Sequence, residues 1–320
     1  MFSSLSRRTW IIGLLLVVVL ILGIVVKLFF FQYIQPPHSA SASTTSYSLR
    51  TVTYCSPGND PQLMDIYTPS SSKNTAMPLV EMVHGGGWTG GVRGGLDSIG
   101  PLPEVPAAML GLLAAGFVVT SIDYRLAPQF KFPDNIEDVK CSIRYLRANA
   151  NQYHIDPNRI GLMGASAGGH LVSLAGLAGQ DAGWDIGEYT DQSSSVQAVV
   201  DMFGPEYIAS GVGDPAIGNP TIFGSNPNEL ELATPAHYIS NTPNSDPPFL
   251  IIQGDKDDTV PPYHSLRFYN DLLNANQPAV LQMVQNAGHG FLSNGPAIIP
   301  APAQISTMIV NFFVKYLTGK

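Results

Sequence analysis

Short apolar runs and stretches with helical periodicity alternate along most of the chain. Residues 167–177 and 305–317 have the spacing of helices, and four apolar residues between 136 and 146 predict a third helix with Arg144 and Arg147 on its outer face. The apolar runs predict short buried strands, and they lie at residues 79–84, 117–122, 160–163, 196–202, 249–253 and 279–284.

This alternation predicts an α/β domain with a mainly parallel central sheet and helices on both faces. Residues 49–54 and 63–67 precede it and predict a hairpin around the turn at residues 56–61. Residues 206–247 break the rhythm, because they are rich in Gly, Pro and Asn. Long irregular segments in such folds often cover a binding site, so we expect a small lid-like insertion there.

The first part of the chain has a different character. Residues 10–26 contain no charged side chain, and Arg7 and Arg8 come shortly before them. A membrane helix needs about 20 apolar residues, and the arginines predict that its N-terminal end lies in the cytoplasm. We therefore interpret residues 1–35 as a membrane anchor or signal segment and residues 36–48 as a flexible linker.

Two localisations fit this segment. If the segment is retained, it anchors the catalytic domain, residues 49–320, to the membrane outside the cytoplasm. If it is a signal peptide, cleavage at the Ala-x-Ala-like site of residues 40–42 secretes the domain. The apolar stretch is longer than the core of an ordinary signal peptide, which favours the anchor.

Composition narrows the classes of partner. The chain has 320 residues, of which 45% are hydrophobic and 12% charged, and its net charge is −8. The sequence contains no basic run, so nucleic acid is not expected as a partner. Cys55 and Cys141 are the only cysteines. They can pair outside the cytoplasm, although no spacing rule supports such a bond.

Residues 164–168 read Gly-Ala-Ser-Ala-Gly and lie between a predicted strand and a predicted helix. This Gly-x-Ser-x-Gly pattern is typical of a nucleophile elbow, in which a sharp turn lifts a serine hydroxyl clear of the sheet. Small neighbours let the backbone close up and let a substrate approach. The pattern in this context predicts that Ser166 is a nucleophile.

A serine nucleophile needs a general base and an acid that orients the base. His289 lies between glycines on a loop after a predicted strand, which suits a base that reaches the elbow. Three carboxylates follow the strand at residues 249–253, and the spacing Gly-x-x-Asp-x-x-Val-Pro favours Asp257 as the acid. Asp255 and Asp258 fit turn and cap positions, with Asp258 kept as an alternative acid.

Residues 84–88 read His-Gly-Gly-Gly-Trp and end an apolar run. Successive glycines free the backbone to aim N–H groups at one point. We expect the amides of Gly86, Gly87 and Ala167 to form an oxyanion hole, and Trp88 to line the substrate pocket.

The remaining histidines favour structural roles. We expect His84 to hold the glycine loop by hydrogen bonds and His170 to be packed and hydrogen-bonded in the helix after the elbow. No histidine pair has metal-ligand spacing, and no Lys-Ser/Thr follows the glycine loop. The sequence therefore predicts neither a catalytic metal nor a cofactor.

Five motifs in this order resemble the α/β-hydrolase fold-3 esterases, which include hormone-sensitive-lipase-like enzymes and acetyl-xylan and feruloyl-esterase-like proteins. The motifs are His84-Gly-Gly-Gly-Trp88, Asp123-Tyr-Arg-Leu-Ala-Pro128, Gly164-Ala-Ser-Ala-Gly-Gly-His170, Phe203-Gly-Pro205 and Gly254-Asp-Lys-Asp257. The resemblance spans residues 54–317 and implies an α/β-hydrolase fold. Ala165 stands where the lipase-like branch usually has Asp. Gly-Gly-His after the elbow and Phe203-Gly-Pro205 resemble the acetyl-xylan and feruloyl-esterase-like branch more closely.

The chemistry and the resemblance together predict a serine carboxylesterase that hydrolyses small or short-acyl esters through an acyl-enzyme. The substrate is then a small-molecule ester, while its acyl and alcohol parts and the oligomeric state are not indicated. A small-amide hydrolase, similar to formamidases, shares the triad chemistry and is one alternative. A non-enzymatic binding module on the same scaffold is another, although such modules usually lose a triad residue.

Overall fold

The computed structural model describes residues 45–70, 75–94, 104–208, 217 and 219–320. The description concerns the unit of residues 45–320. The predicted anchor or signal segment and most of the predicted linker lie outside the described residues. Among the residues that are described, no helix has the length and apolar character needed to cross a bilayer.

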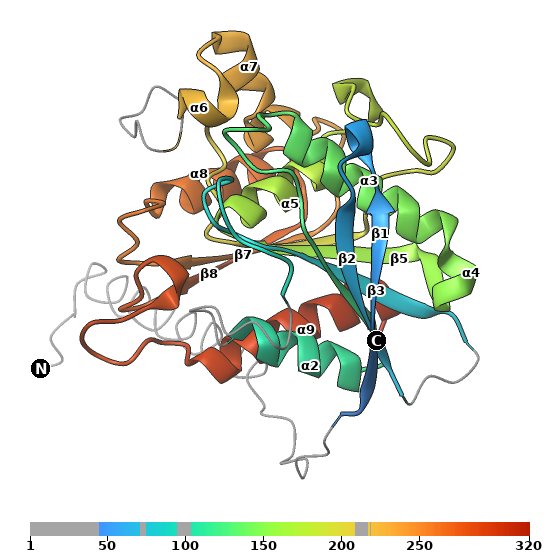
Figure 1. Ribbon diagram of the computed structural model, residues 1–320. Coiled ribbons are helices and arrows are strands. Elements are labelled where there is room, and N and C mark those ends of the chain that lie inside the picture. Colours follow the sequence, from blue (N-terminus) through green and yellow to red (C-terminus); the bar gives the residue numbers. More distant parts are fainter. Residues whose placement is uncertain (1–44, 71–74, 95–103, 209–216, 218) are drawn as a thin grey trace, which may run out of the picture. The chain divides into compact units, whose positions relative to one another are not determined.

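An eight-stranded sheet organises this unit (Figure 1). Its strands are β1 (Tyr47–Cys55), β2 (Gln62–Pro69), β3 (Met77–Val83), β4 (Val118–Ile122), β5 (Ile155–Ala165), β6 (Ala198–Met202), β7 (Phe249–Gly254) and β8 (Ala279–Val284). Their order is β1-β2-β4-β3-β5-β6-β7-β8. β2 pairs antiparallel with β1 and β4, and every other pairing is parallel. The predicted hairpin and parallel sheet are confirmed.

Helices cover both faces of this sheet (Figure 1). α2 (Glu104–Ala114) and α9 (Pro302–Thr318) pack together on one face, while α3 (Asp134–Ala148), α5 (Ala167–Leu177) and α8 (Tyr263–Asn274) lie over the other. Shorter helices lie in the connections: α4 (Ala150–Tyr153), α6 (Pro220–Phe223), α7 (Pro227–Leu232), and the 3₁₀ turns η1 (Pro57–Asn59), η2 (Gln180–Ala182), η3 (Pro235–Tyr238) and η4 (His289–Phe291). The predicted α/β class is confirmed.

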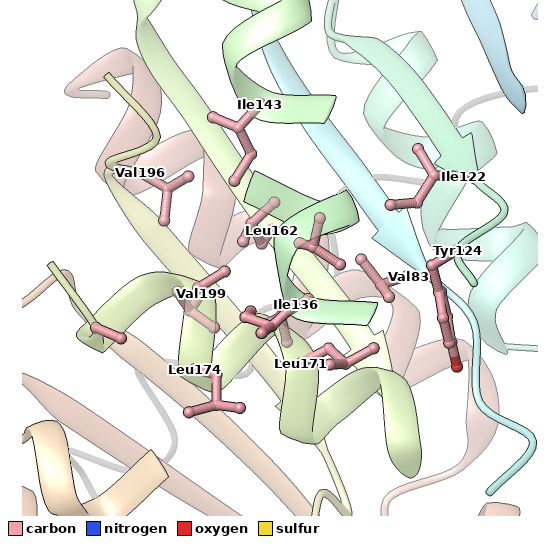
Figure 2. Close-up of a cluster of buried hydrophobic side chains, with 14 of the residues drawn as sticks. Val83, Ile122, Tyr124, Ile136, Ile143, Leu162, Leu171, Leu174, Val196 and Val199 are labelled. Carbon is pink, nitrogen blue, oxygen red and sulfur yellow. The ribbon is translucent and has the colours of Figure 1, made fainter. Parts of the chain in front are cut away.

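Alternation along the strands divides the core into two clusters. On β3, Leu79 and Val83 face the side of α3 and α5, whereas Val80 and Met82 face the side of α2 and α9. Because both faces are covered, the strands read as continuous apolar runs. Figure 2 shows part of the first cluster, with Val83, Ile122, Tyr124, Ile136, Ile143, Leu162, Leu171, Leu174, Val196 and Val199 labelled.

Arg144 is a correction to the predicted face of α3. Its side chain is fully buried, although helical spacing placed it on the outer face together with Arg147, which is half-buried. The Arg144 guanidinium forms an ion pair with Asp185 (2.7 Å) and donates to the carbonyl oxygens of Ile186 and Glu188. A segment distant in sequence therefore covers this side of the helix, and the periodicity of α3 alone carries no sign of it.

A disulfide joins Cys55, the last residue of β1, to Cys141 in α3. The two Cα atoms are 6.5 Å apart, and 86 positions separate the cysteines in the sequence. The pairing that composition only allowed is thus present in the structure. It connects the edge of the sheet to a helix on its face.

A buried carboxyl group lies in the middle of the sheet. Glu81 of β3 accepts hydrogen bonds from the Ser142 hydroxyl (2.6 Å) and the Thr120 hydroxyl (3.4 Å), and it has no solvent exposure. Burial raises the pKa of Glu81 to about 8, and the two hydroxyl donors oppose this shift only in part. Glu81 is therefore mostly protonated in the folded protein at neutral pH.

We predict that Glu81 makes the protein less stable as the pH rises. The folded-state pKa lies above the ordinary value of 4.5, so the stabilising effect is complete below that value and is lost as the pH rises towards about 8. The loss amounts to about 1.4 kcal/mol per pH unit. Glu81→Gln removes the titrating carboxyl group. The free energy of unfolding of this variant, measured in urea, should therefore fall less steeply between about pH 5 and pH 8.

Glu229→Gln is the matched control, because Glu229 is exposed on α7. Its free energy of unfolding should follow the slope of the unmodified protein. A Glu81→Gln slope equal to that of the unmodified protein would contradict the prediction.

Candidate active site

The backbone turns sharply between β5 and α5, and Ser166 is the residue at the turn. Its φ of +55° and ψ of −120° lie in a region that costs a non-glycine residue about 1–3 kcal/mol. Gly164 and Gly168 make the turn possible, because a Cβ atom on either one would collide with the backbone. The Ser166 amide donates to the Met202 carbonyl oxygen of β6 (2.9 Å), which holds the turn against the sheet. This is the geometry of a nucleophile elbow.

Ser166, His289 and Asp257 form a continuous chain of hydrogen-bonded groups. His289 Nε2 lies 2.9 Å from Ser166 Oγ, and His289 Nδ1 lies 2.8 Å from Asp257 Oδ2. The chain can form because the carboxyl ends of the parallel strands β5, β7 and β8 lie at one edge of the sheet. When Ser166 donates to Nε2, the hydrogen of the neutral ring lies on Nδ1 and is accepted by Asp257. The structure thus brings the three predicted residues together.

Both oxygens of the Asp257 carboxylate are hydrogen-bonded, and the side chain has no solvent exposure. Oδ1 accepts from the amides of Thr259 and Val260, each at 2.9 Å. Oδ2 accepts from His289 and from the side-chain amide of Gln253. This set of donors fixes the carboxylate before any substrate binds, as positioning of a catalytic group requires.

The competing carboxylates have other environments. Asp255 accepts a hydrogen bond from the Ala287 amide (3.3 Å) and lies 3.6 Å from the ammonium group of Lys256. Asp258 is exposed, and no interaction among the described residues joins it to His289. The geometry therefore favours Asp257 as the partner of the histidine, with Asp255 at a turn.

Gln253 is a site residue that sequence reasoning missed. Its Nε2 lies 3.2 Å from Asp257 Oδ2 and 3.2 Å from each of the carbonyl oxygens of Gly254 and Val260. Its Oε1 accepts from the Ser265 hydroxyl (2.8 Å). The amide orientation is assigned from this network, since its nitrogen faces three acceptors and its oxygen faces a hydroxyl donor. The sequence did contain a signal for this residue, because Gln253 is a polar side chain at the end of an otherwise apolar strand.

The glycine loop, residues 84–88, is held through its carbonyl groups. His84 Nδ1 lies 2.7 Å from the carbonyl oxygen of Gly85, and the carbonyl oxygen of Gly86 accepts from the amides of Thr89 and Gly90, which follow the loop. A peptide group is planar and trans, so the N–H that follows each carbonyl points the opposite way. The hydrogen bonds of the carbonyl groups therefore fix the directions of the Gly86 and Gly87 amides.

His84 is structural, as predicted. Its ring stacks on that of Tyr124 with centroids 4.3 Å apart, and the Tyr124 hydroxyl donates to the His84 carbonyl oxygen (3.0 Å). Burial lowers the pKa of His84, so the ring is neutral at physiological pH and donates through Nδ1 to Gly85.

The amides expected to form the oxyanion hole have no competing acceptor. Those of Gly86 and Gly87 donate to no group of the described residues. The Ala167 amide is the first of α5, where a helix offers no internal acceptor. The loop also adjoins the elbow, because a Cβ atom on Gly85 would lie 3.3 Å from the Cβ atom of Ser166. Unpaired amides beside a nucleophile can stabilise an oxyanion.

The structure buries Trp88 among core residues, where the sequence favoured a wall of the substrate pocket. Its side chain is 5% exposed, packs edge to face on His170 and Phe223, and donates from Nε1 to His170 Nδ1 (3.2 Å). His170 is fully buried, as predicted for a packed residue, and its Nε2 lies 2.7 Å from the carbonyl oxygen of Ala233. Contact between Trp88 and a substrate stays a prediction that this burial does not favour.

Two buried carboxyl groups behind the elbow were also missed. Asp201 at the end of β6 accepts from a backbone amide of the next turn (2.8 Å), and Glu206 accepts from the Ser173 hydroxyl of α5 (2.9 Å). The two carboxyl groups share a hydrogen bond, and burial raises the pKa of Asp201 to about 7 and that of Glu206 further. The pair therefore keeps a proton at neutral pH. Phe203 lies between Asp201 and Glu206 in the sequence. Its ring packs edge to face on that of His289, with centroids 4.8 Å apart.

In the part of the chain that the structure describes, no three His, Cys, Asp or Glu side chains lie together in a way that could hold a metal ion.

Comparison with known proteins finds a matching family model, relatives that are similar in sequence, and solved structures that are similar in fold. A family model named BD-FAE matches residues 64–272. Esterase LipC of Mycobacterium tuberculosis (strain ATCC 25618 / H37Rv) is 32% identical over 244 residues, or 73% of this chain, and Esterase LipQ of the same organism is 29% identical over 269 residues, or 81% of this chain. A solved structure described as a truncated form of carbohydrate esterase from gut microbiota is 28% identical, with a TM-score of 0.67 over 87% of this chain and 100% of that one.

The chain therefore belongs to the BD-FAE family of α/β-hydrolase fold-3 esterases. The resemblance inferred from the five motifs and the α/β-hydrolase fold are both confirmed. The chain spans only 58% of the length of LipC and 60% of the length of LipQ.

We predict that Gln253→Leu slows the reaction of the Ser166 hydroxyl with a fluorophosphonate about tenfold. The substitution removes the donor that holds Asp257 Oδ2, and a hydrogen bond to a charged group contributes about 1.5 kcal/mol. That free energy corresponds to roughly a tenfold change in rate. The measurement is the rate constant for labelling by a fluorophosphonate, followed by mass spectrometry.

Gln277→Leu provides the matched control. Gln277 is also buried, and it lies just before β8, away from the triad. Its Nε2 donates to the carbonyl oxygens of Ser240 and Thr242. Both variants lose buried hydrogen bonds to carbonyl groups, but only Gln253→Leu changes the support of Asp257. Equal labelling rates for the two variants would rule out a role of Gln253 in positioning.

Proposed function

We propose that the protein is a serine carboxylesterase that hydrolyses small or short-acyl esters through an acyl-enzyme. One observation carries the proposal: the strained elbow presents Ser166 Oγ to His289 Nε2 at 2.9 Å, with Asp257 bound to the far side of the imidazole. Nucleophile, base and orienting acid are the groups that acyl transfer needs. Membership of an esterase family supports the choice of an ester as substrate.

In the acylation step, Ser166 Oγ attacks the carbonyl carbon of the ester. His289 Nε2 takes the hydroxyl proton, and Asp257 stabilises the imidazolium through its hydrogen bond to Nδ1. The carbonyl oxygen becomes an oxyanion, for which the amides of Gly86, Gly87 and Ala167 are the proposed donors. Losing one such donor typically costs about 10²-fold in rate or more.

The tetrahedral intermediate then collapses and the acyl–oxygen bond of the ester breaks. His289 returns its proton to the departing alcohol, which leaves the acyl group on Ser166. Water attacks the acyl carbon and gives a proton to His289, and the same amides are the proposed donors to the second oxyanion. This intermediate collapses as the bond from the acyl carbon to Ser166 Oγ breaks, and His289 returns the proton to Ser166. The products are a carboxylic acid, an alcohol and the free Ser166 hydroxyl.

Proximity also supports a covering role for the insertion at residues 206–247. Phe223 of α6 packs on Trp88 of the glycine loop, and Ala233 bonds to His170 of the elbow helix. The insertion thus contacts the glycine loop and α5, both of which adjoin the nucleophile. We propose that it borders the acyl or alcohol pocket and restricts the size of the ester.

Ser166→Ala should abolish hydrolysis of a p-nitrophenyl acetate-like ester and abolish labelling by a fluorophosphonate. The change removes only the Oγ atom, so the circular-dichroism spectrum and the thermal midpoint should stay close to those of the unmodified protein. A panel of acetyl, butyryl and longer acyl esters, with matched aryl amides, would define the substrate.

Three outcomes would count against the proposal. Hydrolysis that survives in Ser166→Ala would exclude this serine as the nucleophile. Faster cleavage of the amides would favour the small-amide hydrolase. An unmodified protein without either activity or labelling would favour a binding module.

We further propose that the catalytic domain is tethered to the membrane and lies outside the cytoplasm. The uncharged residues 10–26 support the tether, and Arg7 and Arg8 support the orientation. The disulfide between Cys55 and Cys141 supports an oxidising compartment, because cytosolic thiols are kept reduced.

The full chain should sediment with the membrane fraction and be digested by protease added to intact cells. Its cysteines should resist alkylation until they are reduced, which non-reducing mass spectrometry would show. Release of the protein into the medium with a new N-terminus near residues 40–42 would replace the anchor by a cleaved signal peptide. A cytoplasmic protein with two free thiols would contradict both the membrane anchor and the cleaved signal peptide.

A further inference from the structure

The glycine loop contains an unusual run of backbone conformations. Gly86, Gly87 and Trp88 follow one another with φ values of +118°, +61° and +58°. The two glycines adopt such angles without steric cost, but a side chain as large as that of Trp88 does not. A left-handed residue with a Cβ atom costs about 1–2 kcal/mol and persists only where its surroundings hold it in place.

Three contacts hold Trp88 in this conformation. Its carbonyl oxygen accepts from the Ala127 amide (2.9 Å). Its ring packs edge to face on Phe223, with centroids 4.8 Å apart. Its indole N–H donates to His170 Nδ1 (3.2 Å). This is a buried hydrogen bond between the two side chains.

His170 is suited to anchor the indole because both of its ring nitrogens are used. Nε2 lies 2.7 Å from the carbonyl oxygen of Ala233, an acceptor, so Nε2 carries the hydrogen and Nδ1 keeps the lone pair that Trp88 needs. The side chain is fully buried, and burial lowers the pKa of His170 to about 4. The ring therefore stays neutral at physiological pH, and its two hydrogen bonds prevent it from rotating.

The position of Trp88 bears directly on the oxyanion hole. Trp88 follows Gly87, so a shift of its backbone turns the peptide groups on both sides of Gly87 and moves the amides proposed to bind the oxyanion. An oxyanion-hole donor acts only when it lies about 2.7–3.1 Å from the oxyanion. A loop held to a fraction of an ångström is therefore a condition for fast acyl transfer.

We infer that His170 is a positioning residue for the oxyanion hole, and that it acts by accepting the indole N–H of Trp88. This inference rests on the proposed function, since it assigns a role within the same reaction. Through Ala233, His170 also joins the insertion at residues 206–247 to the glycine loop. The two hydrogen bonds of one imidazole thus connect the insertion, the elbow helix and the proposed oxyanion donors.

The first test compares three substitutions that change this contact. His170→Leu removes both hydrogen bonds, Trp88→Phe removes the indole donor and keeps an aromatic ring, and His170→Gln keeps an acceptor and a donor on one side chain. We expect kcat for a short aryl ester to fall at least about tenfold in the first two at nearly unchanged KM, because an oxyanion-hole donor acts mainly in the transition state. His170→Gln should recover much of this loss.

The second test uses a trifluoromethyl ketone, to whose carbonyl carbon Ser166 Oγ adds to form a hemiketal oxyanion while His289 takes the proton. Affinity for this inhibitor should fall by the same factor as kcat/KM, whereas affinity for the carboxylate product should stay within about twofold. The double variant His170→Leu/Trp88→Phe should lose no more than the worse single variant, since both substitutions remove one interaction.

Trp184→Phe is the matched control. Trp184 is 5% exposed like Trp88, and it packs edge to face on Phe132 and Tyr238 instead of on the glycine loop. It should lose thermal stability to a similar degree and keep kcat. If His170→Leu fails to fold, Trp88→Phe alone carries the comparison.

The outcomes separate this inference from the proposed function. An unmodified protein that neither hydrolyses esters nor reacts with a fluorophosphonate would contradict the proposed function. An active protein in which Trp88→Phe behaves like Trp184→Phe, or in which the losses appear in KM alone, would contradict only the role of His170. Fully additive losses in the double variant would have the same meaning.

Discussion

The left-handed backbone of Ser166 is the constraint on which the rest of the structure depends. A serine at this φ is strained, so neighbouring groups must hold it. Gly164 and Gly168 leave room for the turn, and β6 accepts the Ser166 amide. The turn also ends β5 where β7 and β8 end, which lets His289 reach the hydroxyl from a separate loop. Folding and reactivity are linked at this residue, because relief of the strain would also remove the hydroxyl from its base.

Buried polar groups around the site are largely neutral. Burial keeps a proton on Glu81 and on the pair formed by Asp201 and Glu206, and it keeps His170 uncharged. Each of these side chains also has a hydrogen-bond partner, which is Ser142 for Glu81, Ser173 for Glu206 and Trp88 for His170. Electrostatic interactions in a dry interior are strong, so a charge placed near the base would alter its proton affinity. Among these buried polar side chains, Asp257 is the one that is hydrogen-bonded to the imidazole of His289.

Much of the fold could be read from the sequence, because both faces of the sheet are covered and its strands appear as apolar runs. The motif residues were equally readable, since a nucleophile elbow and a glycine loop need small residues at fixed spacings. Long-range contacts were not readable. The burial of Arg144 depends on Asp185, and the support of Asp257 depends on Gln253, whose amide faces groups on either side of the turn. The burial of Trp88 was not readable either, because its partner, His170, lies in another element.

The disulfide between Cys55 and Cys141 has a mechanical consequence. β1 is the outermost strand and the first described element, so tension on the preceding chain would enter the domain through this strand. The hydrogen bonds of β1 to β2 can separate one after another, but the covalent bond passes the load from Cys55 to α3. Peeling of the sheet from this edge therefore stops at β1. The load then enters α3 without first separating β2 from β4.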